Sequence, residues 1–526
     1  MTKSISENGE YHEIFVGVAE PNKRGATGVI NALKQALTAN FGEDGLQLLR
    51  RISSVVTDGA SVNIGAKGGV WALLESEIKL LTETCSENAM PPLPLLKVWC
   101  AVHRSQLAWH SVSDAVTEVK HCFQNLVSLV SFFHTSAVRT RELKEVADDN
   151  SLKLLHLPAV FEIRWTEFSY TLLHAVLTSW RALTTYLRQS SELSAGGHCR
   201  FLTSHSTLQL LSFLADLLFV FARFQKRLQS NATTLLDMQE AVNNVQSQIA
   251  ELKSNPLTGG WQEALERCIT VSNGEVFLYG IQLSVDKRRR EHHHSFVSDK
   301  RDPAAVRNEI IESISEFLRQ RFSLDEAVFS RLFPFVHFDE DNVNMHEVHD
   351  LIGSDLDLAQ LSCEFKELAK HRNVTRTNLA DLVKHLASKD NAEMYPNILC
   401  IMSRILAAKP HSADVERCIS ANNLLKTSLR ASLKLNTENS YLFIHHNLPP
   451  TAEWDPRPSV LDWLQTPRRE KTHKKAKFQK YFRHVFSEAQ KEGTDEHLDH
   501  DESADPSNED ALKVPYSIND SRQRQF

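Results

Sequence analysis

The stretch ISSVVTDGASVNIG, residues 52–65, decides how the rest of the chain is arranged, because it predicts a buried strand that stops on a carboxylate. Its first half is rich in β-branched residues, as a central strand prefers, and Asp58-Gly59 predicts the turn that ends it. An acidic side chain at the carboxyl end of a strand lies where open α/β sheets carry their chemistry. Asp58 is therefore a candidate functional residue, although Asp at such a junction also commonly caps the following segment.

Composition indicates a globular chain of two or more domains, with 526 residues, 42% hydrophobic and 24% charged. The net charge of −7 argues against an overall nucleic-acid binder, so such contacts need local basic patches. Eight cysteines without a CxxC pair argue against a disulfide framework or zinc ribbon, and favour a reducing compartment. The most apolar window, 208–222, is too short to span a bilayer and contains Asp216, so no membrane partner is expected.

Outward from Asp58, the pattern on both sides alternates between strand and helix. Asn8-Gly9 predicts a hairpin turn, and β-branched and apolar residues in short runs predict strands. Apolar residues at helical spacing predict the helices between them. The expected strands are 11–18 and 95–100, and the expected helices are 26–40 and 70–81. This order of elements predicts an α/β layer.

Cys100-Ala-Val-His103 follows the strand 95–100 directly. Its Cys-x2-His spacing could hold half of a metal site, but no second pair of ligands lies nearby in the sequence. A buried thiol and a histidine packing at a strand-to-helix junction is the more common arrangement. A single long helix is expected over 103–133.

From residue 169 to about 384 the pattern is nearly all helical. Apolar residues in 235–252 alternate spacings of three and four, which predicts one arm of a helical hairpin. Asp302-Pro303 predicts a helix start, with the Asp as N-cap and the proline in the first turn.

One short motif precedes this helical region and another lies within it. Arg164-Trp165 ends a short extended segment, where a tryptophan is more often a core residue than a ligand platform. KRRREHHH, residues 287–294, favours a solvated loop, with a nuclear import signal as the alternative.

Residues 396–448 carry three apolar helical patterns. The middle helix is expected to start near His411, with Ser412 as cap and Glu416 in or just past its first turn, where the helix dipole favours an acidic residue. Beyond Pro449 a basic block, 468–483, precedes an acidic run, which predicts a mostly disordered charged tail.

These motifs, in this order, resemble the hAT superfamily of DNA transposases and the host proteins derived from them. TDGASVNIG looks like the segment of the family's second catalytic carboxylate, and SADVERCIS like that of the third. The remaining motifs look like its Cys-x2-His pair, its DNA-handling Arg-Trp pair and its dimerisation region. The matching residues are Asp58, Cys100, His103, Arg164, Trp165 and Glu416.

The resemblance implies an RNase H-like mixed α/β sheet, interrupted by a large all-α insertion and followed by a helical C-terminal dimerisation region. The implied boundaries are 1–168 for the first part of the RNase H-like domain and 169–384 for the insertion. The second part, with the dimerisation region, is 385–450, and 451–526 is the tail. Dimerisation is expected through Ile401, Ile405, Leu424, Leu442 and Phe443.

The family's chemistry uses three carboxylates that bind two divalent ions for phosphoryl transfer. The first carboxylate belongs on a strand upstream of the hairpin at Asn8-Gly9, and we expect it, with its strand, to be missing from this chain. Asp58 and Glu416 would then be relics, and no cofactor is expected. Mg²⁺ bound by Asp58 and Glu416 is expected only if an upstream Asp exists.

The expected function is that of a dimerising, catalytically inactive nuclear factor associated with DNA or chromatin. Its partner would be a second copy or a related hAT-like protein, and 468–483 would direct nuclear import. One alternative is a fragment of an active metal-dependent transposase. Another is an adaptor or SUMO-ligase role, as ascribed to some domesticated relatives.

Overall fold

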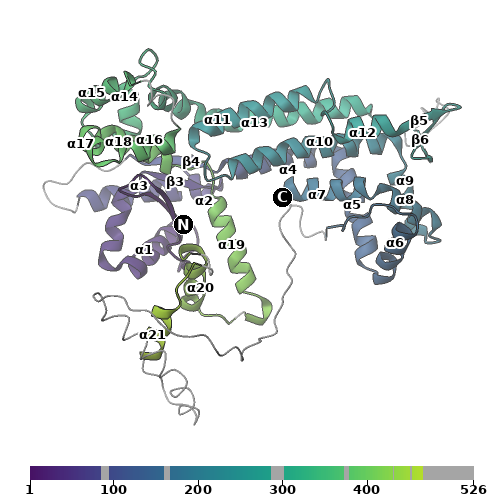
Figure 1. Cartoon of the computed structure of the whole chain (residues 1–526), viewed down its shortest axis with the longest axis horizontal. Helices are drawn as coiled ribbons and strands as arrows, with labels where there is room; N and C mark the ends of the chain where they lie inside the picture. Colours follow the sequence, from purple (N-terminus) through teal and green to yellow (C-terminus); the bar gives the residue numbers. More distant parts are fainter. Residues whose placement is uncertain are drawn as a thin grey trace, which may run out of the picture. The chain divides into compact units, whose positions relative to one another are not determined.

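The computed structural model describes residues 1–83, 94–158, 166–285, 301–371, 378–430, 432–449 and 453–465. The chain forms two compact units, Met1–Leu448 and Pro449–Phe526. Within the described ranges the second unit contributes one helix, α21 (Arg457–Gln465). The first unit mixes many helices with short strands, and helix dominates (Figure 1).

An antiparallel hairpin opens the chain. Strands β1 (Thr2–Ile5) and β2 (Tyr11–Ile14) pair with Thr2 opposite Ile14. Gly9 adopts a φ of 75° in the turn, a conformation that costs a glycine little. A Cβ at this position would also lie 2.8 Å from the Lys384 Cα. Both the positive φ and the lack of space therefore require glycine here. The hairpin expected at Asn8-Gly9 is confirmed.

The strand expected to end at Asp58 is confirmed as β3, but it is half-buried rather than buried, and within the described residues it forms a two-stranded parallel sheet with β4. Ser54 lies opposite Leu96 and Thr57 opposite Trp99. Helices α1 and α3 contact each other and enclose a small apolar core that also includes Val16 and Leu49. The elements of this region are α1 (Ala26–Phe41), the 3₁₀ helix η1 (Gly42–Arg51), β3 (Ser54–Thr57), α2 (Ser61–Ile64), α3 (Val70–Glu83) and β4 (Leu96–Trp99).

The single helix expected over 103–133 is wrong, because the structure divides it into α4 (Ala101–Ala115) and α5 (Thr117–His134). Val116 separates them with extended dihedral angles, φ −90° and ψ 106°. Its side chain is fully buried in the main apolar core. The spacing of apolar residues in the sequence continues across Val116 and does not mark this break.

A layer of long helices forms most of the unit. Helices α10, α11 and α13 contact one another, and α7 lies along α10. Thr234 and Asp237 form a reciprocal capping box at the start of α11, and Asp302 accepts a hydrogen bond from the Ala304 amide at the start of α13. The expected helical hairpin and the Asp302-Pro303 start are confirmed. The helices are α6 (Ala137–Asp149), α7 (Thr166–Thr178), α8 (Trp180–Gln189), α9 (Leu193–Leu202), α10 (His205–Leu228), α11 (Leu235–Glu251), α12 (Trp261–Cys268) and α13 (Pro303–Val336).

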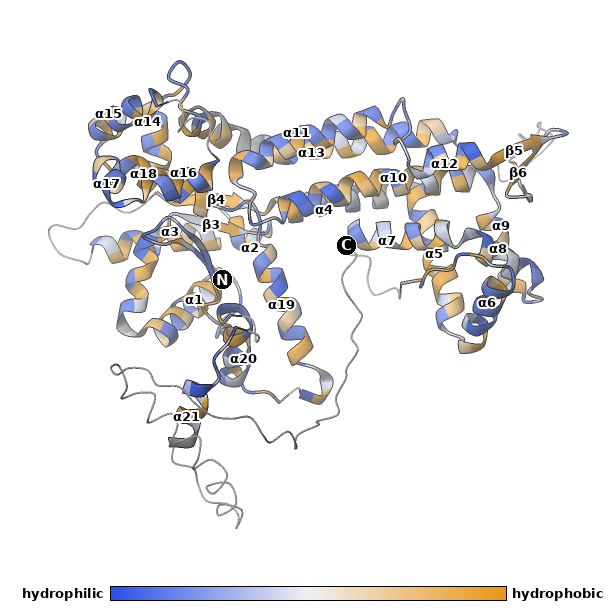
Figure 2. Ribbon diagram, in the orientation of Figure 1, coloured by the Kyte–Doolittle hydropathy of each residue, from blue (hydrophilic) through white to orange (hydrophobic). Residues whose placement is uncertain are grey.

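Helix α10 is the one described helix long and apolar enough, by composition, to cross a membrane. It is longer than the apolar window 208–222 suggested, and it is largely orange in Figure 2. However, 67% of its most apolar window is buried inside the protein. Asp216, in mid-helix, accepts hydrogen bonds from the Trp261 and Gln262 amides and so caps α12. The helix is therefore a central core element of this unit.

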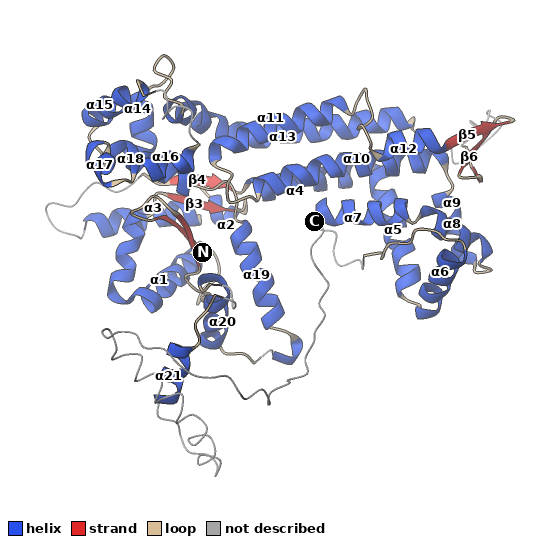
Figure 3. Ribbon diagram, in the orientation of Figure 1, coloured by secondary structure: helices blue, strands red, loops and turns tan. Residues whose placement is uncertain are grey.

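A three-stranded antiparallel sheet interrupts the region expected to be nearly all helical (Figure 3). Two-residue turns join its strands, Asn273-Gly274 and Tyr279-Gly280, and all four turn residues have positive φ. Such turns match the twist of paired strands, and Asn-Gly is a strong hairpin signal that helical periodicity on either side obscured. The strands are β5 (Ile269–Ser272), β6 (Glu275–Leu278) and β7 (Ile281–Leu283).

The three helices expected in 396–448 are confirmed as α18, α19 and α20. Helix α18 begins at Pro396, and the buried carboxylate of Glu364 accepts hydrogen bonds from the Asn397 side chain and the Ile398 amide there. Helix α18 contacts α15, α16 and β1, while α19 and α20 contact each other. The bounds are α14 (Met345–Val348), the π-helix η2 (His349–Gly353), α15 (Leu358–Ala369), α16 (Leu379–Leu386), α17 (Lys389–Met394), α18 (Pro396–Ala407), α19 (Ala413–Leu425), η4 (Ser428–Arg430) and α20 (Leu435–Asn447).

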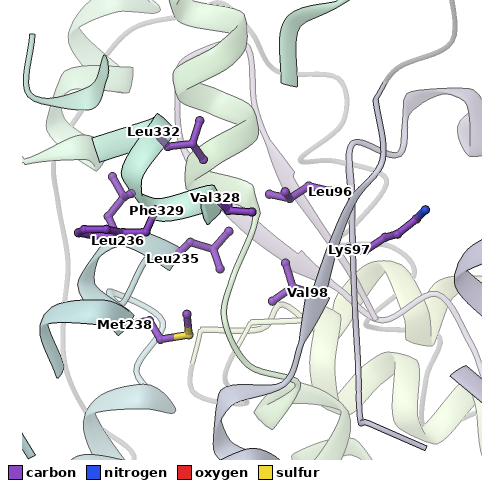
Figure 4. A pocket seen from close by; sticks show the side chains of 9 residues that line it. All are labelled: Leu96, Lys97, Val98, Leu235, Leu236, Met238, Val328, Phe329 and Leu332. Carbon is purple, nitrogen blue, oxygen red and sulfur yellow. The ribbon is translucent and has the colours of Figure 1, made fainter. Parts of the chain in front are cut away.

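Strand β4 joins the α/β part to the long helices through apolar packing (Figure 4). Leu96 and Val98 meet Met238 of α11 and Leu332 of α13 around a small cavity of about 20 Å³. A space of this size holds at most one water molecule, and all of its lining residues except Lys97 are apolar. It is a packing defect rather than a ligand site.

The carboxyl edge of the β3–β4 pair as a candidate functional site

Asp58 lies exposed where β3 ends. Its Oδ1 accepts hydrogen bonds from the Ala60 amide at 3.0 Å and from Asn63 Nδ2 at 2.6 Å. The carboxylate therefore closes the turn that leads into α2, as Asp often does at such a junction. The structure thus gives Asp58 a capping role, and one of its two oxygens is already engaged.

Gly59 fixes the end of β3 against the end of β4. A Cβ at this position would lie 2.2 Å from the Cζ2 atom of Trp99 and 2.5 Å from its Nε1. Only glycine lets the indole ring lie this close to the turn. The Asp58-Gly59 turn and Trp99 are consequently one packed unit at the carboxyl edge of the strand pair.

Cys100 and His103 follow on the neighbouring strand end. The Cys100 amide donates to the Thr57 carbonyl at 2.8 Å, and the fully buried Sγ accepts from the Ser412 amide at 3.4 Å. His103 lies one turn further along α4 and is partly buried. The thiol therefore serves packing and holds the segment before α19, which fits the structural interpretation of this motif.

A group of buried charges surrounds the start of α19. Asp414 is 2% exposed, and its Oδ2 lies 2.8 Å from Lys3 Nζ, while Arg417 pairs with its Oδ1. Burial acts to raise the pKa of Asp414, but Lys3 and Arg417 outweigh it and leave the pKa below its usual value. Lys3 Nζ also donates to the His411 carbonyl at 3.3 Å. The N-terminal hairpin is thereby fastened to α19.

The segment 409–412, which precedes α19, is also held by contacts with other parts of the chain. Lys409 is buried, and its Nζ donates to the Asn231 carbonyl at 2.6 Å and lies 4.4 Å from the centre of the Tyr11 ring. Burial lowers the pKa of Lys409 to about 8. The Pro410 carbonyl accepts from the Ala101 amide at 2.8 Å. These contacts join the turn between α10 and α11, the hairpin and the start of α4.

The expected capping role of Ser412 is wrong. Ser412 occupies the N-cap position of α19, but its side chain makes no capping hydrogen bond. The Nδ1 atom of the fully buried His411 accepts from the Ala413 amide at 3.3 Å instead. Glu416 is partly buried in the same helix, and burial raises its pKa. The imidazole of His411 therefore caps α19, which is the role that the sequence suggested for the hydroxyl of Ser412.

This donor set does not fit a pair of Mg²⁺ ions. Asp58 is exposed and engaged in its own turn, and burial raises the pKa of Glu416, which disfavours the charged form that binds a metal ion. The neighbouring Asp414 is neutralised by two cations. Throughout the described ranges, no group of three or more His, Cys, Asp or Glu side chains is placed to hold a metal ion. The edge brings Asp58, Trp99, Cys100 and the start of α19 together without assembling a set of metal ligands.

Sequence reasoning missed the ion pair between Lys3 and Asp414 and the neutral imidazole of His411 that caps α19. Lys3 and Asp414 are separated by most of the chain, and no local pattern marks a pair so distant. Arg164 and Trp165 lie outside the described residues, as do the basic stretches 287–294 and 468–483.

The five residues expected to mediate dimerisation divide into two groups. Ile401, Ile405 and Leu442 are fully buried within the single chain, so they have no surface left for a partner. Leu424 is 79% exposed and Phe443 43% exposed. The helical spacing identified apolar positions correctly but could not say which face the chain itself covers.

No known protein-family model matches this chain. The proposal below therefore rests on the order of the motifs and on the contacts and surfaces described here.

Proposed function

We propose that this chain is a transposase-derived protein that self-associates through α19 and α20 and associates with DNA in the nucleus, without catalysing strand transfer. The order of motifs supports an RNase H-like α/β part interrupted by a helical insertion. So does the parallel β3–β4 pair, which carries Asp58 at its carboxyl edge and is separated from α19 by the long helices. A two-metal mechanism is not part of the proposal, because the residues at this edge do not fit it.

The observation that carries self-association is an exposed apolar surface on the last helices of the first unit. Its residues lie on the consecutive elements α19, η4 and α20 and are 41–95% exposed, and so many exposed large apolar side chains favour a partner that covers them. A second copy that meets this surface with its own would bury both, as in a two-fold dimer. We define the α19–α20 surface as Val415, Ile419, Leu424, Leu429, Tyr441, Phe443 and Ile444.

Sedimentation velocity at micromolar concentration tests this proposal. We expect the wild-type chain to be a dimer and the double variant Ile419→Glu/Leu424→Glu to be a monomer, because two buried carboxylates without partners oppose association. Leu193→Glu is the matched control, since Leu193 is 96% exposed at the start of α9 and lies outside the surface. This control should remain a dimer.

A wild-type monomer under these conditions would refute self-association. So would a double variant that sediments as a dimer with unchanged affinity. Unfolding of each variant in urea shows whether it is folded, and both variants change only exposed side chains.

A further inference from the structure

Arg321 presents an exposed guanidinium at the carboxyl edge of the β3–β4 pair. It lies on α13, with its Cζ 5.3 Å from the centre of the Trp99 ring and 5.3 Å from the centre of the Phe317 ring. A guanidinium over aromatic rings is held in position by attraction to their faces. The cation is therefore fixed next to the Asp58-Gly59 turn that Trp99 packs against.

The support beneath Arg321 is rigid. Trp99 is wedged against Gly59, and the fully buried Arg104 has its Cζ 5.6 Å from the centre of the Trp99 ring. Arg104 also lies over Phe322 and donates a hydrogen bond to the Arg321 carbonyl at 2.9 Å. Both the backbone and the side chain of Arg321 are thus held before any ligand arrives.

Among the side chains that the structure describes, which leave out those of 324–327, no carboxylate lies within ion-pair distance of Arg321. Arg319, two residues earlier on the same helix, is exposed as well, but its Nη2 lies 2.7 Å from Glu316 Oε1. One arginine of this pair is therefore neutralised, and the other retains its capacity to bind an anion.

We propose that Arg321 binds a backbone phosphate of DNA at this edge, which rests on the DNA association proposed above. A planar guanidinium offers two parallel N–H groups to phosphate oxygens, and fixing it beforehand lowers the entropy lost on binding. The chain's net charge of −7 gives no general attraction for DNA, so binding needs local, pre-formed cations.

Fluorescence anisotropy with a labelled 20-base-pair duplex, measured from 50 to 200 mM salt, tests this contact. Arg321→Gln should weaken binding about tenfold at 100 mM salt and lower the slope of log affinity against log salt by about 0.9, the loss of one phosphate contact. The affinity of Arg321→Lys should lie between those of the wild type and Arg321→Gln, since lysine keeps the charge but lacks the planar pair of N–H donors. Arg319→Gln is the matched control and should bind within about twofold of the wild type.

The outcomes separate this contact from the broader proposal. The assignment of Arg321 is overturned if Arg321→Gln keeps the affinity and salt slope of the wild type. It is also overturned if Arg319→Gln loses as much affinity as Arg321→Gln. In both cases DNA association itself stands. If the wild type does not bind the duplex even at 50 mM salt, DNA association and this contact both fall. The sedimentation test of the α19–α20 surface is independent of either result.

Discussion

The imidazole of His411 joins two functions that are usually separate, because it caps a helix and lies within a cluster of charges. Its Nδ1 must stay unprotonated to accept a hydrogen bond from the Ala413 amide. The positive charges of Lys3 and Arg417 nearby disfavour a further positive charge on the imidazole ring. Burial, the largest cause, and Lys3 lower the pKa of His411 to about 4. The start of α19 therefore depends on a neutral histidine.

Acid should destabilise the protein through this residue. Between pH 6.5 and about 4 the unfolded chain binds a proton at His411 that the folded chain does not, so stability falls as pH falls through this window. From pH 7 to pH 5 the loss amounts to about 2 kcal/mol. Urea unfolding at the two pH values should show a smaller loss in His411→Asn than in the wild type.

The exposed His346 provides the control for this experiment. His346→Asn should retain the full loss of the wild type between pH 7 and pH 5. If His411→Asn showed the same pH dependence as the wild type, the proton would bind elsewhere and the capping account would fail.

At the scale of elements, α20 takes the place of a neighbouring strand. Asn447 Oδ1 accepts from the Phe15 amide and its Nδ2 donates to the Phe15 carbonyl, at 2.8 and 2.9 Å. Asn439 makes the same pair of contacts with Val18 at 2.6 and 2.8 Å. Each side-chain amide thus imitates a backbone peptide and satisfies the extended segment that follows β2. Leu442 lies buried between these two asparagines in the sequence of α20.

Adjacent positions of α20 should respond differently to truncation. Leu442→Ala should cost about 2 to 4 kcal/mol of unfolding free energy, because Leu442 is fully buried against Phe15 and Cys418. Phe443→Ala should cost less than about 1 kcal/mol in the monomer, since this side chain is 43% exposed. Urea denaturation in the Ile419→Glu/Leu424→Glu background measures the two changes without dimerisation. Equal costs would show that Phe443 belongs to the core.

For the whole molecule, the sequence was informative wherever the signal was local. The turn at Gly9, the strand before Asp58 and the helix start at Asp302 each follow from a few neighbouring residues, and each is confirmed. Features set by distant contacts could not be predicted in this way. Val116 separates two helices while its side chain is buried in the core, and Asp414 is neutralised by a lysine at the other end of the chain. Only the folded chain brings those groups together.

Localisation is a property of the whole chain, and the basic block 468–483 lies outside the described residues. We expect a fluorescent fusion that lacks 466–484 to lose nuclear enrichment, because this block is the densest cluster of lysine and arginine in the sequence. Live-cell imaging of the deletion beside the full chain measures the effect. Unchanged nuclear enrichment would shift the assignment to Lys287–Arg290.

The attachment of the N-terminal hairpin to α20 has a consequence for biosynthesis. Phe15 and Asn447 are 432 positions apart, so the hairpin leaves the ribosome long before the helix that satisfies its backbone. At roughly 5 to 20 residues per second, this delay lasts on the order of 20 to 90 s. During that time the extended segment that follows β2 has polar groups without their final partners, and it is open to pairing with other chains. Nascent chains of this protein should therefore depend on chaperones until α20 emerges.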